Sequence, residues 1–267
     1  MKIFCLSIYN ENYKLFKELN LIPVGLGNQN FGDEWLNDKG TFNISKKNIN
    51  FGEYTFHYNL WKNKFNNEKY DDWIGFCSYR RFWIKNDTLK PKNILELKKS
   101  IIQKPDDSWN DNEVILVEPL IFNKIKNIKL VKRSFFEVLK KPSVLYKKTS
   151  IKDQFNIFHG SYFLKNAISF LNKSDQLEFS KFLDGYEYNP YNMFICKNSD
   201  ILIKFYDEIF PWLFKCEDLF KNKNLIGYDK IRIYGFLAER YMPYWFRKNF
   251  KTLNWPISFF DTHKINF

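Results

Sequence analysis

The chain has 267 residues, and its 42 Lys and Arg against 30 Asp and Glu give a formal net charge of +12. With 45% hydrophobic and 20% aromatic residues but only ten glycines and nine prolines, the composition excludes a disordered, collagen-like or linker-dominated chain. The length favours one domain comprising residues 1–267. The positive charge suits nucleic acid, an anionic membrane or a phosphorylated ligand, and does not choose among them.

Cysteine spacing and hydropathy favour a cytoplasmic protein. Cys5, Cys77, Cys196 and Cys216 form no CxxC pair, so the sequence indicates neither a zinc knuckle nor a secreted disulfide framework. No stretch approaches the roughly 18 consecutive apolar residues that a membrane span requires. We therefore expect a reducing, cytoplasmic compartment.

In the first half of the chain, short apolar runs predict buried strands at residues 2–9, 73–77 and 113–118. Residues 25–50 are rich in Gly, Asn and Asp and predict a long binding loop. Aromatic residues at spacings of three and four predict one helix over residues 51–65, in which Asn50 is the N-cap and Glu53 its capping-box partner.

From residue 91 onward, helical patterns dominate. Apolar spacing predicts helices near residues 91–102, 162–171, 176–183, 200–220 and 233–241, and one short strand at residues 193–196. The early alternation of strands and helices predicts an α/β fold with a mostly parallel sheet flanked by helices and a helical C-terminal part.

The strand at residues 73–77 ends abruptly on Ser78, Tyr79, Arg80 and Arg81. In open α/β folds, ligands bind at the carboxyl edge of the parallel strands. The guanidinium fork matches phosphate oxygens, and a pair of them neutralises a diphosphate. Two interpretations stay open at this point: a diphosphate site, or structural ion pairs with acidic loop residues.

Carboxylate pairs do not predict a metal site. A nucleotide-sugar transferase of the GT-A fold usually holds its metal with Asp-x-Asp at a strand end, and this chain has none there. The pairs at residues 71–72 and 106–107 lie in loops. A divalent ion such as Mn²⁺ or Mg²⁺ is therefore not expected to be essential.

Three carboxylates are candidates for a general base that takes a proton from a hydroxyl group. Glu53, Asp33 and Glu239 qualify, and we favour Glu53 because it lies in the motif-rich first half. Glu53 also has a structural interpretation as a cap, and Glu239 one as the ion-pair partner of Arg240. Trp35, in the polar loop, is the candidate for stacking on an acceptor sugar.

Several segments together resemble a known family. They are Asn43-Ile44-Ser45 with Asn48, Glu53-Tyr54-Thr55, Trp61-Lys62-Asn63, residues 74–82 (IGFCSYRRF), Asn192-Met193-Phe194-Ile195, Trp212-Leu213-Phe214 and residues 235–240 (GFLAER). In this order they resemble the bacterial capsular and exopolysaccharide glycosyltransferases first catalogued as domain of unknown function 4422. Ser78 stands where that family usually has a histidine.

The resemblance implies a GT-A-like fold and transfer of galactofuranose or a related hexose from a nucleotide diphosphate to a growing capsular, exopolysaccharide or lipopolysaccharide glycan. The basic surface suits peripheral contact with the anionic inner face of the cytoplasmic membrane, where lipid-linked glycan acceptors lie, and we expect such an acceptor and no nucleic acid. We expect Asn192 to bind the acceptor together with Trp35. The residues that we expect to bind the donor are Arg80, Arg81, Tyr79, Ser78, Asn43, Ser45, Asn48 and Lys62.

Two alternatives of other classes remain. The charge and frequent aromatic residues suit a single-stranded nucleic-acid-binding protein, which combines phosphate contacts with base stacking. The other alternative is a non-catalytic carbohydrate-binding subunit that retains the fold. A nucleotide-sugar panel in a thermal-shift assay distinguishes these, because selective ligand binding raises the apparent stability.

Overall fold

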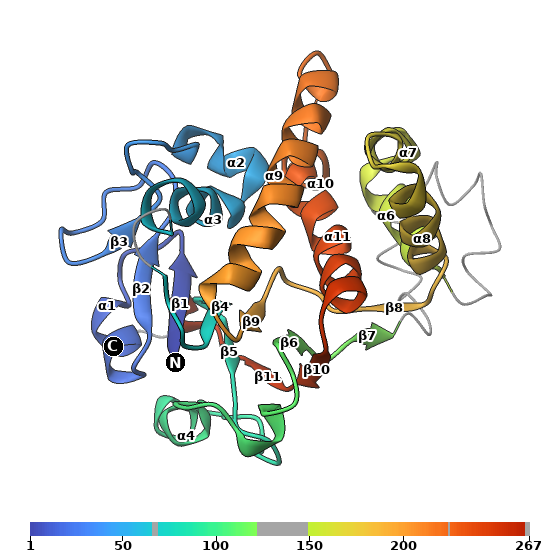
Figure 1. Cartoon of the computed structure of the whole chain (residues 1–267). Coiled ribbons are helices and arrows are strands. Elements are labelled where there is room, and N and C mark those ends of the chain that lie inside the picture. Colours follow the sequence, from blue (N-terminus) through green and yellow to red (C-terminus); the bar gives the residue numbers. More distant parts are fainter. Residues whose placement is uncertain (66–68, 122–148, 224, 265–267) are drawn as a thin grey trace.

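The computed structural model describes residues 1–65, 69–121, 149–223 and 225–264 (Figure 1). Its central sheet has the strand order β10-β6-β9-β4-β1-β2-β3. β9 is antiparallel to both of its neighbours, whereas the other pairs along this path are parallel. These strands are β1 (Lys2–Ser7), β2 (Ile22–Gly25), β3 (Leu36–Asn37), β4 (Ile74–Ser78), β6 (Val114–Val117), β9 (Phe194–Cys196) and β10 (Thr252–Trp255).

Two further strand pairs complete the β-structure. β5 (Arg81–Trp83) turns back from β4 and pairs with β11 (Ile257–Phe259), so that the end of the chain joins the central sheet. β7 (Leu120–Ile121) and β8 (Glu187–Tyr188) form a separate antiparallel pair.

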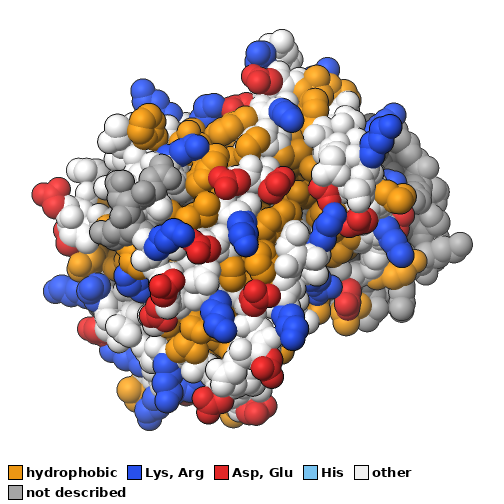
Figure 2. Space-filling view, in the orientation of Figure 1, with side chains coloured by type: hydrophobic (Ala, Val, Ile, Leu, Met, Phe, Trp, Pro, Cys, Tyr) orange, Lys and Arg blue, Asp and Glu red, His pale blue; other side chains and the backbone are white. Residues whose placement is uncertain are grey.

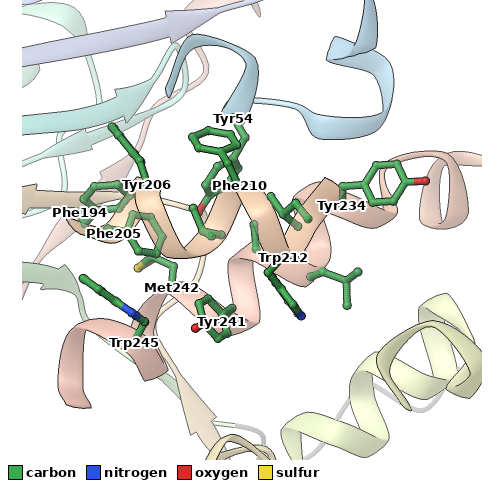
Figure 3. Packing of buried hydrophobic residues seen from close by; sticks show 14 of the residues in the cluster. Tyr54, Phe194, Phe205, Tyr206, Phe210, Trp212, Tyr234, Tyr241, Met242 and Trp245 are labelled. Atoms are coloured by element: carbon green, nitrogen blue, oxygen red, sulfur yellow. The ribbon is translucent and has the colours of Figure 1, made fainter. Parts of the chain in front are cut away.

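Helices cover both faces of the sheet because its strands are apolar on both sides. Along β1, Phe4 and Leu6 pack into one core, and Ile3 and Cys5 pack into the other. The larger core lies against most of the helices, and Figure 3 shows its aromatic side chains interleaving between α9 and α11. The helices are α1 (Tyr13–Glu18), α2 (Asn48–Phe51), α3 (Tyr54–Asn59), α4 (Ile94–Ser100), α6 (Ile151–His159), α7 (Ser161–Ser169), α8 (Lys173–Leu183), α9 (Ser199–Phe220), α10 (Tyr228–Ile231) and α11 (Ile233–Asn249).

The predicted architecture is confirmed. The strands expected from apolar runs form at β1, β4, β6 and β9, and the helices expected in the second half form at α7, α8, α9 and α11. The C-terminal part is helical, apart from the final strands β10 and β11. The direction of β9 is what makes the sheet mixed rather than wholly parallel.

The single helix predicted over residues 51–65 is wrong. Gly52, with φ +59° and ψ −132°, ends α2 and separates it from α3, which continues into a π-helical turn at Leu60–Lys64. Asn50 therefore lies inside α2 instead of capping a helix, and its side-chain amide donates to the carbonyl of Ile231. The capping-box interpretation of Glu53 is therefore also wrong, because no side chain caps α3.

The predicted loop at residues 25–50 is partly ordered structure. It contains the short strand β3, a 3₁₀ turn at Ser45–Lys47 and most of α2. The buried carboxylate of Asp38 accepts hydrogen bonds from the Gly27 amide at 3.2 and 3.3 Å, which fixes the loop that follows β2. Helix α4 begins at Ile94 after an Asn93 cap, so Pro91 precedes it.

Candidate functional site

The strand order places a switch point between β1 and β4. From β1 the sheet continues to β2 on one side and to β4 on the other, so the loops after these strands diverge at their shared carboxyl edge. Such a point is the usual ligand site of an open α/β sheet. Because β9 is antiparallel to β4, its first residues reach the same edge. Figure 1 shows α2 and α3 beyond the arrowhead of β1.

Three adjoining cavities, which we call together the cleft, occupy this edge. The first and second measure about 470 Å³ each and the third about 210 Å³. The first is lined by Leu6, Ile8, Leu26, Asn48, Gly52, Glu53, Ser78, Tyr79, Arg80, Tyr228 and Arg232. The second adds Gly27, Asn28, Gln29, Ser45, Lys46, Ile49 and Ile231. The third adds Arg81, Tyr191, Asn192, Gly235, Phe236 and Glu239.

Arg80 and Arg81 both lie in the cleft. The apolar strand β4 ends at Ser78 and the chain turns into β5, which leaves the two arginines at the carboxyl edge of the sheet. The Arg81 guanidinium lies 4.0 Å from the ring centre of Tyr191, and that of Arg80 lies 5.3 Å from the ring centre of Tyr79. Within the described ranges, neither arginine forms an ion pair with a carboxylate, so their charges stay available to an anion.

A third guanidinium, that of Arg232, faces them from the end of α10. It lines all three cavities, and its Nη2 lies 3.3 Å from Oε2 of Glu53. The glycine at position 52 leaves room for the Arg232 guanidinium, because a Cβ atom on residue 52 would overlap Nη2 of Arg232. Glu53 is 28% exposed and lines the first and third cavities. It is therefore a carboxylate that a ligand in the cleft can reach.

Glu239 has a different environment, although it also lines the cleft. Its Oε1 accepts a hydrogen bond from the backbone amide of Tyr191 at 2.7 Å, and its Oε2 pairs with the buried Arg240. Arg240 also donates to Oε1 of Gln154 at 2.7 Å. Both carboxylate oxygens of Glu239 are thus engaged in holding the segment before β9, which suits a positioning role better than that of a base.

Four further residues that the sequence suggested as donor ligands also line the cleft. Ser78 and Tyr79 lie at the end of β4, and the Oγ of Ser78 is buried without a hydrogen-bond partner among the described residues. Burial raises the pKa of Tyr79, so its hydroxyl stays protonated. Asn48 bonds to the Gly52 carbonyl at 2.9 Å, and Ser45 donates to Asn43 at 2.8 Å. Both Asn48 and Ser45 line the second cavity.

Four other suggested residues do not line the cleft. Asn43 donates to the Gly40 carbonyl at 2.6 Å and shapes the turn before Ser45. The ammonium of Lys62 lies 3.3 Å from the ring centre of Trp61 in the π-helical turn. Asp33 is exposed on the loop after β2. Trp35 is only 4% exposed and packs on Phe31 and Phe16 in the smaller core, so the structure does not offer it as an exposed stacking platform.

Sequence reasoning missed Arg232, Tyr228, Tyr191 and Asp38. Arg232 and Tyr228 lie far along the chain from the arginine pair, and no motif singled them out. Tyr191 directly precedes the Asn192 that was selected, and its φ of +77° is visible only in the structure. Asp38 lies in the loop that was expected to bind, but its burial could not be foreseen from a polar sequence.

The cleft does not fit a divalent metal ion. Its two carboxylates, Glu53 and Glu239, are each paired with an arginine, and arginine charges dominate its walls. Divalent Mg²⁺ and Mn²⁺ prefer several oxygen ligands. Nowhere in the described ranges do three His, Cys, Asp or Glu side chains come together in a way that could hold a metal. All four cysteines are buried free thiols.

The sheet topology and the cationic cleft at its switch point define an open α/β fold whose ligand site lies at the carboxyl edge of the strands. The chain belongs to the family described as domain of unknown function DUF4422, whose model matches residues 5–250. Its fold is similar to a solved apo structure of WbbM, described as a bifunctional glycosyltransferase, with a TM-score of 0.69 and 18% sequence identity. The match covers 98% of this chain and 45% of that one, so this chain spans less than half of its length. No curated protein matches the chain.

Two further features concern the helices and the surface charge. In the part of the chain that the structure describes, no helix combines the length and apolar character needed to cross a bilayer. Figure 2 shows Lys and Arg side chains interspersed with Asp and Glu over the face it presents. That face therefore carries no continuous basic stripe of the kind that tracks a nucleic-acid backbone.

Proposed function

We propose that this chain is a glycosyltransferase that moves a sugar from a nucleoside diphosphate donor to a glycan acceptor. The observation that carries the proposal is the position of Arg80 and Arg81 in the cleft without a carboxylate partner among the described residues. Arg232 adds a third guanidinium to the lining of the same cavities. This arrangement suits a diphosphate, whose oxygens match the guanidinium fork.

The arginines also suit the chemistry of the leaving group. When the bond between the sugar and the diphosphate breaks, negative charge grows on the departing phosphate oxygen. Cations already fixed in place stabilise this charge without reorganising during the reaction. Stacking on Tyr79 and Tyr191 limits the freedom of the two guanidiniums, which supports such preorganisation.

Glu53 is the group best placed to act as the base. Its Oε2 faces Arg232, and its Oε1 has no hydrogen-bond partner in the described part of the chain. In a direct displacement, this carboxylate takes the proton of the acceptor hydroxyl while the hydroxyl oxygen bonds to the anomeric carbon and the diphosphate leaves. Glu239 is less suited, because both of its oxygens are engaged.

The finer parts of the proposal come from the family resemblance and the basic surface. They are galactofuranose or a related hexose as the transferred sugar, a lipid-linked capsular, exopolysaccharide or lipopolysaccharide glycan as acceptor, and peripheral contact with the anionic inner face of the cytoplasmic membrane. The net charge of +12 suits such contact, because anionic lipids attract basic surfaces.

Ligand binding tests the proposal first. Purified protein is titrated with UDP, GDP and dTDP and with their hexose conjugates, and the shift in melting temperature is recorded. Selective stabilisation by one nucleotide series is expected, because binding to the folded state raises its apparent stability. Stabilisation by single-stranded RNA alone would instead support the nucleic-acid alternative. Nucleotide-sugar binding without turnover on any glycan acceptor would support a non-catalytic subunit.

A further inference from the structure

The third cavity, of about 210 Å³, adjoins the arginine pair and has less than half the volume of either of the other two cavities. Two polar atoms in its wall residues lack hydrogen-bond partners in the described part of the protein, namely Oδ1 of Asn192 and Oγ of Ser78. Buried polar atoms are rarely left unpaired, so each such case calls for a ligand or an ordered water.

Asn192 is held in a fixed orientation. Its Nδ2 donates to the Gly235 carbonyl at 3.3 Å, which leaves Oδ1 as the free acceptor. Asn192 is only 7% exposed and has a φ of +52°, directly after Tyr191 with +77°. Two consecutive non-glycine residues in the left-handed region are costly, and such conformations gather at functional sites.

The surroundings maintain this backbone conformation. Glu239 accepts a hydrogen bond from the Tyr191 amide, and the buried Arg240 secures Glu239 from behind. The Tyr191 ring at the same time stacks on the Arg81 guanidinium. The same contacts thus position the Tyr191 ring against Arg81 and fix the backbone that carries the free Oδ1 of Asn192.

The third cavity is continuous with the proposed diphosphate site. Arg80, Arg232 and Glu53 line both the first and the third cavities. A sugar attached to a diphosphate between these arginines enters the third cavity next, with its anomeric carbon near Glu53.

The inference rests on the proposed function. We propose that the third cavity binds the monosaccharide carried by the donor, and that Asn192 Oδ1 accepts a hydrogen bond from a hydroxyl group of that sugar. Asn192 is then a specificity-determining residue for the transferred sugar, in place of the acceptor role expected from the sequence. Ser78 Oγ lies in the same wall and supplies a second polar contact.

The test compares a nucleoside diphosphate with its hexose conjugate by isothermal titration calorimetry, using whichever of UDP, GDP or dTDP binds. Asn192→Gly keeps the left-handed backbone and removes the side chain. It is expected to raise the Kd of the hexose conjugate about 5- to 30-fold and to leave that of the free diphosphate within about twofold. Asn192→Asp retains an acceptor oxygen but loses the donation to the Gly235 carbonyl, so it is expected to recover only part of the wild-type ratio of the two Kd values.

Asn28→Gly is the matched control, because Asn28 lines only the second cavity. It is expected to change both Kd values by the same factor. A conjugate lacking the hydroxyl that Asn192 contacts is expected to bind the wild type weakly and to be insensitive to Asn192→Gly, which identifies the hydroxyl.

The outcomes distinguish a failure of the sugar assignment from a failure of the proposed function. If wild-type protein binds both ligands and Asn192→Gly changes both Kd values equally or neither, the sugar assignment is overturned and the proposed function stands. If Asn192→Gly raises only the KM of the acceptor, the cavity serves the acceptor and the assignment is again overturned. If no nucleoside diphosphate or conjugate binds the wild type, the proposed function itself fails.

Discussion

The Arg232 guanidinium lies 3.3 Å from the Glu53 carboxylate, although 179 positions separate the two residues in the sequence. Both side chains are about one quarter exposed, so the ion pair itself contributes little to stability. Its importance is positional. It places one of the three cleft arginines beside the carboxylate that we propose as the base, and thereby joins the start of α3 to the end of α10.

Removing either arginine of the pair should weaken donor binding. Arg80→Ala and Arg81→Ala are each expected to raise the Kd of the nucleoside diphosphate about 10- to 100-fold, because each deletes charge-assisted hydrogen bonds to phosphate. Lysine substitutions should recover only part of the loss, since they restore the charge without the fork. Arg247→Ala, on the exposed side of α11, is the control and should leave the Kd unchanged. An unaltered Kd in both alanine variants would remove the basis of the proposed function.

Glu53→Gln should separate catalysis from binding. The amide keeps the size of the side chain but cannot take a proton, so kcat is expected to fall about 10²- to 10⁴-fold with little change in donor Kd. Glu239→Gln should instead weaken binding, because it removes the charge that pairs with the buried Arg240 and so loosens the segment before β9. Steady-state kinetics and calorimetry on both variants test the assignment of Glu53 as the base. A Glu53→Gln enzyme with wild-type kcat would contradict it.

Two glycines allow the position of Arg232 to be tested independently of backbone strain. Gly52 and Gly227 have φ of +59° and +81°, so alanine at either position should cost about 1–3 kcal/mol in the free energy of unfolding. A Cβ at Gly227 has nothing within 4 Å, whereas a Cβ at Gly52 would displace Arg232.

Urea unfolding should therefore show similar losses of stability for Gly52→Ala and Gly227→Ala. Only Gly52→Ala is expected to weaken nucleoside diphosphate binding as well, by about tenfold or more. Equal donor affinity in the two variants would show that Arg232 does not need its observed position.

The buried His57 predicts a component of acid sensitivity. Burial lowers the pKa of His57 to about 3, and its Nδ1 lies 2.7 Å from the Tyr206 hydroxyl. In the unfolded chain the pKa of histidine is about 6.5, so between these values the unfolded state binds a proton that the folded state does not. The contribution of His57 to stability should therefore fall as the pH falls, by up to about 1.4 kcal/mol per pH unit.

His57→Gln removes this component. The variant is expected to be less stable than the wild type at pH 7, and the difference between them should shrink as urea unfolding is repeated at pH 5.5 and 4.5. Other titrating groups cancel in the comparison. A difference that stays constant with pH would contradict the neutral state assigned to His57.

Chelation tests the role assigned to the arginines. The proposed diphosphate site holds two guanidinium groups without a carboxylate partner, and its own carboxylates, Glu53 and Glu239, are each paired with an arginine. Transfer is therefore expected to persist in excess EDTA at a rate within about twofold of the untreated enzyme. Loss of activity that manganese restores would show that the arginines do not suffice for leaving-group stabilisation.

The sequence alone located most of the framework. Apolar runs marked β1, β4, β6 and β9, and the abrupt end of the run before Ser78 pointed to Arg80 and Arg81 at the sheet edge. These features follow from local patterns: burial on both faces requires continuous apolar residues, and the point at which they stop is visible in the sequence. The family resemblance, which the match over residues 5–250 confirms, rested in part on the same segments, namely those at β4 and β9.

Only the tertiary structure decided which loops meet. The break at Gly52, which turned Glu53 from an expected cap into a cleft carboxylate, depends on a backbone conformation that aromatic spacing did not reveal. The burial of Trp35 and the approach of Arg232 to Glu53 depend on strand order and on the reversed direction of β9. Local periodicity carries no information on such long-range pairings, because they are fixed by the packing of the whole sheet and its helices.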